Sequence, residues 1–194
     1  MPGPRRPGPA TRPALALPHA GMHTGMPVDS LEQDLFAGYA PEKTEDLRGY
    51  GVLMGVFSAL ATAFAAWFRT SGRELPERIE GRDLVLLTVA SHKASRMLSK
   101  DRVTSPLRAP FARYEGEAGP GEVSESPRGR GLRRAIGELL LCPYCLGMWT
   151  SAGLVGGLLV VPRFTRWAAS VLSIFFGSEL LQIAYKKAED SLSG

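Results

Sequence analysis

The sequence predicts an all-α fold, a polytopic membrane helix bundle of three to four membrane segments that follows a disordered N-terminal tail. The first observation is that long uncharged runs alternate with stretches dense in Arg, Glu, Pro and Gly. A soluble domain would instead spread its apolar residues at the period of a strand or a helix. The second observation is the run at 49–68, whose 20 residues carry no charge. This length matches the roughly 20 residues that cross the hydrocarbon core of a bilayer.

Residues 1–48 are predicted to form a disordered tail that becomes acidic towards its end, because they are rich in Pro, Gly and Arg and show no periodicity. The membrane helical domain is expected to occupy residues 49–187. Within the tail, the apolar patch at residues 14–17 is bounded by Pro13 and Pro18 and is too short for the apolar core of a signal peptide. No secretory signal peptide is therefore expected.

The membrane helices are located by their apolar runs. In the first run, Tyr50 and Trp67 lie near the two ends, where amphipathic rings prefer the membrane interface. Pro162 and the arginines after it predict a tight turn between the last two helices. The predicted helices are 49–68, 84–99, 144–161 and 167–185.

Two shorter elements are expected between the second and third of these helices. The interval 112–131 is rich in Gly, Pro, Glu and Ser, which predicts a flexible surface loop. A short helix follows, because Ile136, Leu139 and Leu140 recur at helical spacing. The Cys-Pro-Tyr-Cys unit at 142–145 is then expected at the start of a new helix, since its proline breaks the short helix and suits a first helical turn.

The segment 84–99 leaves two topologies open. Its polar residues form one stripe along a mostly apolar helix, which is typical of an interfacial helix or of a short span whose polar side faces the bundle. Both topologies can place the arginine-rich segment 100–134 in the cytoplasm, as the positive-inside rule requires. They differ at the N-terminus, because three spans would export the N-terminal tail, whereas four spans keep both ends inside. We favour four segments, with the basic loop, the C-terminus and both cysteines at the cytoplasmic face, where thiols are normally reduced.

Small residues recur at every fourth position in two of the predicted helices. The longer stripe consists of Gly51, Gly55, Ala59 and Ala63, and the shorter one of Gly153 and Gly157. Such faces allow helices to approach closely in lipid, where packing drives their association. They predict either one compact bundle or a homo-oligomer joined through the same faces.

The net charge of +4 arises from basic residues that flank the hydrophobic segments. A nucleic-acid-binding protein would instead gather its basic residues on one face together with aromatic side chains. The lipid bilayer, with its anionic surface, is therefore the expected partner, and no nucleic acid is expected.

The two cysteines carry the recognisable chemistry. The pair Cys142 and Cys145 resembles the active-site tetrapeptide of glutaredoxins, although no strand pattern precedes it. A helix N-terminus lowers the pKa of a thiol, and a second thiol at this spacing resolves a mixed disulfide, so thiol–disulfide redox chemistry is one hypothesis. Zinc binding by the same cysteines is a second hypothesis. The site would need either His92 and one acidic residue as further ligands, or four thiolates contributed by a dimer. A structural role at the helix entry is favoured over both, with no enzymatic activity and no cofactor.

Four motifs occur together in the second half of the chain. They are Ser95-Arg96, Asp101 to Phe111, Gly131 to Leu140 and Cys142 to Trp149. In combination they resemble a small bacterial membrane-protein family of unknown function, over approximately residues 83–187. The resemblance implies a location in a bacterial membrane and supplies no activity, substrate or cofactor.

Several positions are candidates for functional or structural roles. They are Arg96, Asp101, Arg108, Glu138, Cys142, Pro143, Cys145, Trp149 and Glu179. An acid inside a membrane helix is costly, so Glu179 is expected either to face the bundle and pair with Arg96 or His92, or to lie at the interface.

Overall fold

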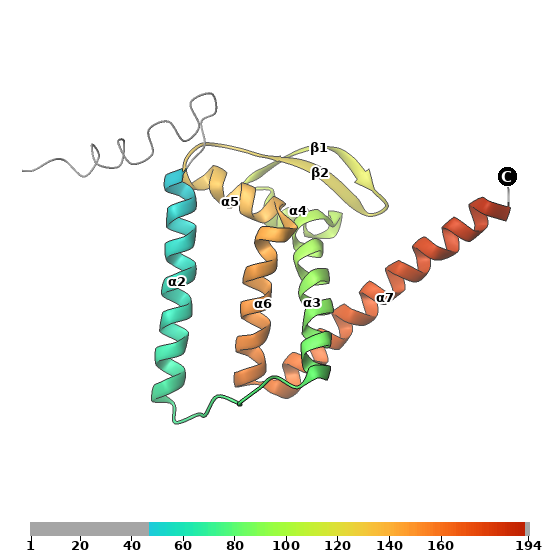
Figure 1. Cartoon of the computed structure of the whole chain (residues 1–194). Helices are drawn as coiled ribbons and strands as arrows, with labels where there is room; N and C mark the ends of the chain where they lie inside the picture. Colours follow the sequence, from blue (N-terminus) through green and yellow to red (C-terminus); the bar gives the residue numbers. More distant parts are fainter. Residues whose placement is uncertain (1–46, 193–194) are drawn as a thin grey trace, which may run out of the picture. The chain divides into compact units, whose positions relative to one another are not determined.

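The computed structural model of the protein describes residues 47–192, and these are mostly helical, as predicted. The elements are α2 (Leu47–Thr70), α3 (Gly81–Lys100), the 3-10 helix η1 (Arg102–Thr104), α4 (Ser105–Arg108), β1 (Ala112–Gly119), β2 (Glu122–Pro127), α5 (Leu132–Leu141), α6 (Pro143–Val160) and α7 (Pro162–Leu192) (Figure 1). The predicted N-terminal tail lies outside the described residues, apart from its last two residues, which begin α2.

Three of the helices are long and apolar enough to cross a membrane, namely α2, α6 and α7. The chain is therefore a multi-pass membrane protein in contact with the lipid bilayer. The helix α3 is not among the three, because it carries Ser, His, Lys and Arg side chains along its length. Its 20 residues nevertheless span about 30 Å, the thickness of the hydrocarbon core.

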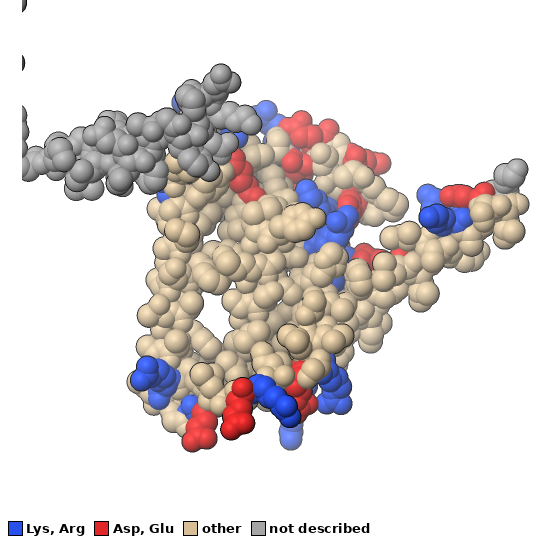
Figure 2. Space-filling model, viewed as in Figure 1, with Lys and Arg blue, Asp and Glu red and all other residues tan. Residues whose placement is uncertain are grey.

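The helices α2 and α6 run in the same direction, and α3 runs in the opposite direction beside α6 (Figure 1). Charged side chains gather at the two ends of these helices and leave an apolar band between them (Figure 2). We call residues 101–141, which join α3 to α6 at one end, the cap. It contains η1, α4, both strands and α5.

The core lies where α3, α6 and α7 meet. Ala90 of α3 and Ala169 of α7 are fully buried, and the side chain of Leu87 is packed beside them. Partly buried apolar side chains from all three helices surround this centre, namely Leu86, Leu154, Val155, Leu158 and Leu172. Because the two alanines have no bulk beyond Cβ, α3 and α7 approach closely at this point.

A β-hairpin occupies the interval where the composition predicts a flexible loop, so that prediction is wrong. The strands β1 and β2 pair antiparallel from Ala112 with Pro127 to Gly119 with Glu122. Gly121 adopts a φ of 76° in the turn, a conformation that favours glycine. The hairpin buries only Ala112 and Val123 among its apolar residues, so its sequence lacks the apolar alternation that identifies a strand.

The predicted tight turn between the last two helices lies before Pro162 rather than after it, because α7 begins at that proline. Only Val161 separates α6 from α7. A proline ends the preceding helix but is well suited to the first position of the next one, where its missing N–H is not needed. As a result, Arg166 lies within the first turns of α7.

The small-residue faces do not hold the helices together as predicted. A Cβ atom built on Gly51, Gly55 or Gly153 would meet nothing within 4 Å, and Ala59 and Ala63 are exposed as well. The stripe fails because α2 turns a different, aromatic face towards the rest of the chain. Gly157 is the exception, since a Cβ atom there would lie 2.8 Å from the hydroxyl oxygen of Thr165 at the junction of α6 and α7.

Candidate functional site

Arg108 is the central side chain of the cap, and it is fully buried. Its Nε donates to Oε2 of Glu125 on β2 at 2.5 Å, and both groups are shielded from solvent. The remaining guanidinium hydrogens bind the carbonyl oxygens of Leu98 (2.8 Å) and Asp101 (3.0 Å) and the hydroxyl oxygens of Thr104 (2.6 Å) and Ser105 (3.1 Å). Arg108 therefore fixes the hairpin to the last turn of α3.

The local sequence explains why Arg108 reaches this position. The last carbonyl groups of a helix lack partners within the helix and attract positive charge. The hydroxyl group of Thr104 donates to the Met97 carbonyl oxygen at 2.6 Å and turns the chain back towards the end of α3. Pro106 then lies in the first turn of the short helix α4, which carries Arg108 against the same end.

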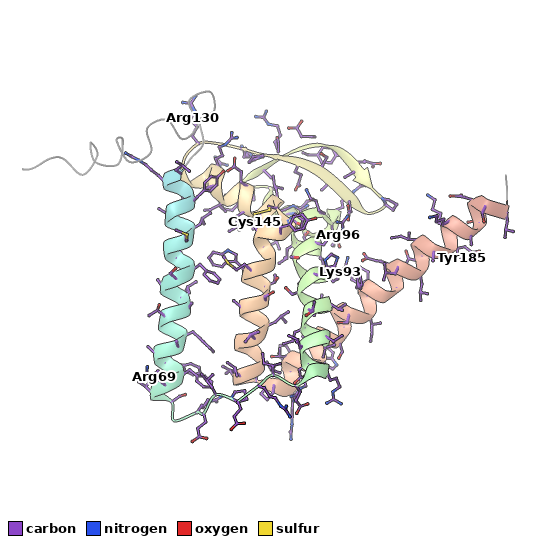
Figure 3. All side chains as sticks on the ribbon, viewed as in Figure 1. Arg69, Lys93, Arg96, Arg130, Cys145 and Tyr185 are labelled. Carbon is purple, nitrogen blue, oxygen red and sulfur yellow. A yellow bond between two sulfur atoms is a disulfide. The ribbon has the colours of Figure 1, made fainter. Side chains whose placement is uncertain are left out.

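A second buried cation, Lys93, lies between α3 and α7 (Figure 3). Its Nζ atom donates to Oε1 of Glu179 at 2.5 Å and to Oδ2 of Asp101 at 3.4 Å. The same Nζ lies 4.2 Å from the centre of the Phe175 ring, in a cation–π arrangement. Lys93 is a buried charge that the sequence analysis does not identify, as are Asp83 and Glu125.

The expected pairing of Glu179 with Arg96 or His92 is replaced by the pair with Lys93. Arg96 instead binds both carboxylate oxygens of Glu122, at 2.9 and 3.0 Å, and so joins α3 to the turn of the hairpin. The ring of His92 packs edge-on against Phe176, with ring centres 5.2 Å apart. The side chains at 92, 93 and 96 are close together on α3 but contact different elements, α7 for His92 and Lys93 and the hairpin for Arg96.

At the opposite end of α3, the buried carboxylate of Asp83 binds Arg166 in the first turns of α7. Arg166 Nε lies 2.9 Å from Oδ1, and Nη2 lies 2.7 Å from Oδ2. The helices α3 and α7 are therefore joined by one ion pair near each end of their contact, Asp83 with Arg166 and Lys93 with Glu179.

Hydroxyl groups join α3 to α6 between these two ion pairs. The Ser91 side chain lies 2.8 Å from the hydroxyl oxygens of both Thr150 and Ser151, and it donates to the Gly147 carbonyl oxygen at 3.3 Å. Polar contacts of this kind are favourable between helices in lipid, because water is not present to compete for the same groups.

Arg102 connects η1 with the strand β1 of the cap. Its Nη2 donates to Oε1 of Glu117 at 2.7 Å. This hydrogen bond, together with the negative charge of Glu117, raises the pKa of Arg102.

Glu138 and Trp149 both face α2. The hydroxyl group of Tyr50 donates to Oε2 of Glu138, whose other oxygen accepts from Arg134 at 2.9 Å. The rings of Phe57 and Trp149 meet edge-to-face with centres 5.0 Å apart. Two of the candidate positions therefore serve the attachment of the first membrane helix.

The cysteine pair lies at the start of α6, as predicted from its proline (Figure 3). Cys142 is the N-cap residue, Pro143 is the first residue of the helix, and Cys142 Sγ accepts from the Cys145 backbone N–H at 3.1 Å. The two sulfur atoms form a disulfide, and Cys145 is exposed. The pair was expected to be reduced, so this is a difference from the sequence-based expectation.

The zinc hypothesis gains no third ligand from the part of the chain that the structure describes. Among residues 47–192, no group of three His, Cys, Asp or Glu side chains is placed to hold a metal ion. His92 is engaged with Phe176, and a disulfide offers no thiolate. A site made of four thiolates from two copies stays a prediction.

Taken together, the apolar helices, the buried ion pairs between them and the cap define a small multi-pass membrane protein. Residues 86–185 match the family described as a protein of unknown function (DUF1360), and the chain belongs to this family. It is also similar to the sporulation protein YjcA of Bacillus subtilis (strain 168), with 34% identity over 99 residues, which are 50% of this chain and 84% of that protein. No solved structure matches. The resemblance noted in the sequence is confirmed.

The family region contains nearly all of the contacts described above. Lys93, Arg108 and Glu179 lie within it, as do both cysteines. Asp83 lies just before it, and α2 lies wholly outside it.

Proposed function

We propose that this chain is a four-segment membrane protein that acts as a structural or interaction component of a bacterial membrane, with its cap in the cytoplasm. The direction of the helices supports four segments. If α2 and α6 both cross the membrane in the same direction, the chain must return between them, and α3 is the helix that makes this return (Figure 1).

The distribution of arginines supports a cytoplasmic cap. Seven arginines lie between residues 101 and 141, whereas two lie in the connection between residues 71 and 80 at the other end. An excess of basic residues in short loops marks the cytoplasmic side, and acidic residues contribute little to this bias. The helix α7 ends on the side of the cap with Lys186 and Lys187 near its end (Figure 1).

The choice of a structural role rests on one observation, namely that the buried cations Arg108 and Lys93 are fully bound by other groups of the protein. Arg108 donates to five acceptors, and Lys93 is held by two carboxylates and a ring. A catalytic acid or base needs a group that is free to exchange a proton with a substrate. These side chains instead fix the cap to the bundle, which leaves the outer face of the hairpin for contact with other molecules.

The proposal is tested in the native host by changing exposed hairpin residues. Tyr114→Ala and Arg113→Ala each remove an exposed side chain of β1. Because successive strand residues point to opposite faces, the two variants together alter both faces of the hairpin. We expect the variant protein to reach normal levels in the membrane and to show the phenotype of a deletion. If the host forms spores, spore yield is the first phenotype to measure, since a similar protein is named a sporulation protein. Wild-type behaviour of both variants would contradict the proposal.

A thiol–disulfide function is the second candidate, because Cys142 and Cys145 are joined and Cys145 is accessible. A partner dithiol would attack one sulfur, and two electrons and two protons would pass to the pair as the partner becomes a disulfide. Replacement of both cysteines by Ser removes this chemistry and any zinc site formed by two copies. Normal function of the double variant would exclude both.

A homo-oligomer through the small-residue faces stays a prediction. The face of α2 that carries Gly51 and Gly55 is exposed, which leaves it open to a second copy or to lipid. The mass of the purified protein in mild detergent tests this prediction.

A further inference from the structure

The first membrane helix, α2, contacts α5 and α6 through an evenly spaced set of aromatic side chains. Tyr50, Phe57 and Phe64 follow one another at intervals of seven residues, so they lie along one stripe of α2. Tyr50 binds Glu138, Phe57 packs on Trp149, and the ring of Phe64 lies over Gly156.

The receiving surface has the same spacing. Trp149 and Gly156 are also seven residues apart, and α6 runs parallel to α2. A Cβ atom on Gly156 would lie 3.6 Å from the Phe64 ring, so a glycine at this position lets the ring approach the backbone of α6. We call the surface formed by Glu138, Trp149 and Gly156 the docking face.

Between these side chains, α2 stands away from α6, and Figure 2 shows openings between the two helices. Near the C-terminal end of α2, the side chain of Phe68 is buried. At the far end, Arg73 Nη1 donates to the carbonyl oxygens of Leu159 and Val160, at 3.4 and 3.1 Å. This contact places the connection between α2 and α3 against the end of α6 in the same chain.

The region that matches the family includes the surface that α2 contacts but does not include α2. Residues 86–185 match the family, and this range includes all three residues of the docking face but neither α2 nor the connection after it. The docking face is therefore part of the family domain, whereas α2 lies outside it.

We infer that the docking face is a binding surface for a transmembrane helix, and that α2 is the helix which this chain supplies for it. The surface fits a helix that runs parallel to α6, carries a tyrosine at the membrane interface and has two aromatic rings at successive intervals of seven residues. The tyrosine hydroxyl recognises the Glu138 carboxylate, and the rings set the register against Trp149 and Gly156. This inference does not depend on which side of the membrane the cap occupies.

The test converts α2 into a separate chain within the full-length protein. A protease recognition sequence is inserted between Glu77 and Arg78, in the connection between α2 and α3. The purified protein is cut in mild detergent, held through a C-terminal tag and washed, and the α2 fragment that stays bound is measured.

We expect the wild-type fragment to stay bound after cutting. Phe57→Ala on α2 and Trp149→Ala on the docking face should each weaken its retention about tenfold, the upper end of what one aromatic pair contributes. Ala59→Leu is the matched control, because Ala59 lies on the exposed side of the same helix. Its retention should equal that of the wild type.

Two further measurements keep the result unambiguous. The uncut variants should elute as single species of the same size as the uncut wild type, which shows that they are folded. In a mixture of tagged and untagged copies, the cut tagged protein should retain only its own fragment. The inference would be overturned if the wild-type fragment is lost, or if Ala59→Leu loses as much of its fragment as Phe57→Ala does. It would also be overturned if Phe57→Ala and Trp149→Ala lose none, or if the tagged protein retains a fragment from the other copy.

Discussion

Arg108 shows how much of this molecule depends on single buried charges. Its guanidinium joins the end of α3, the turn of α4 and the strand β2 through one set of hydrogen bonds. Removing one partner of a buried pair leaves the other charge without compensation, which is more costly than never having had the pair.

We therefore expect Arg108→Met to lower the free energy of unfolding of the cap by about 3–5 kcal/mol, because Glu125 is left buried and unpaired. Arg113→Met is the control, and as an exposed change it should cost no more than about 0.5 kcal/mol. Hydrogen exchange of the hairpin amides in detergent measures both. Equal protection in the two variants would show that the Arg108 contacts do not stabilise the cap.

The pair of Lys93 and Glu179 should behave as one unit. Glu179→Leu leaves Lys93 with the more distant carboxylate of Asp101, so we expect a large loss of folded yield. The double variant Lys93→Met with Glu179→Leu removes both charges and should recover most of this yield. A double variant that is no better than Glu179→Leu would contradict the importance of this pair.

The sequence points to several of these residues but not to their partners. Arg96, Arg108, Glu138 and Glu179 were identified as candidates, and each of them makes an ion pair. Lys93 was missed because it lies beside the more conspicuous polar stripe. The sequence carries no clear signal for it, because the burial of Ala90, which shares its helix face three residues earlier, is visible only in the structure.

At the scale of elements, α5 depends on a close approach to the base of the hairpin. A Cβ atom on Gly137 would lie 2.5 Å from the Phe111 carbonyl oxygen and 3.2 Å from Cβ of Pro127. Neither neighbour is the free end of a flexible side chain, so a larger residue must displace the helix.

Gly137→Ala should destabilise the protein by about 1–3 kcal/mol through this overpacking. Gly147→Ala is the matched control in α6, where nothing lies within 4 Å of the added Cβ atom. There the change should be neutral or stabilising by up to about 1 kcal/mol, because alanine favours helix. Thermal unfolding in detergent compares the two, and the reverse order of stability would refute this account of the α5 packing.

The membrane helices were the most predictable elements, because long uncharged runs leave few alternatives. The short helix before Cys142 and the helix start at Pro143 were predicted for the right reasons, from apolar spacing and proline chemistry. The hairpin was not predictable in this way. Its strands are held by Glu122 and Glu125 pairing with arginines of α3 and α4, and such long-range ion pairs leave no periodic pattern in the strands themselves.

At the scale of the whole molecule, the proposed topology places the hairpin and the C-terminus on the cytoplasmic side of the membrane and the connection between α2 and α3 on the other side. A reporter that is active only in the cytoplasm should be active when fused after Gly194 or inserted at Gly121 in the hairpin turn. The same reporter inserted at Gly72, between α2 and α3, should be inactive. Activity at Gly72 together with Gly121 would mean that α3 does not cross, and the three-span topology would replace the one proposed here.

The sequence separation of the buried contacts imposes an order on the synthesis of the chain. All partners of Arg108 lie between residues 98 and 125, so the cap can close soon after the hairpin leaves the ribosome. Glu179 follows Lys93 by 86 residues. At about 5–20 residues per second, the nascent lysine waits on the order of ten seconds for its main counter-charge. During that interval α3 holds a folded cap at one end and an incompletely compensated cation within its length. A chain that stops before α7 is complete therefore keeps Lys93 without its main counter-charge.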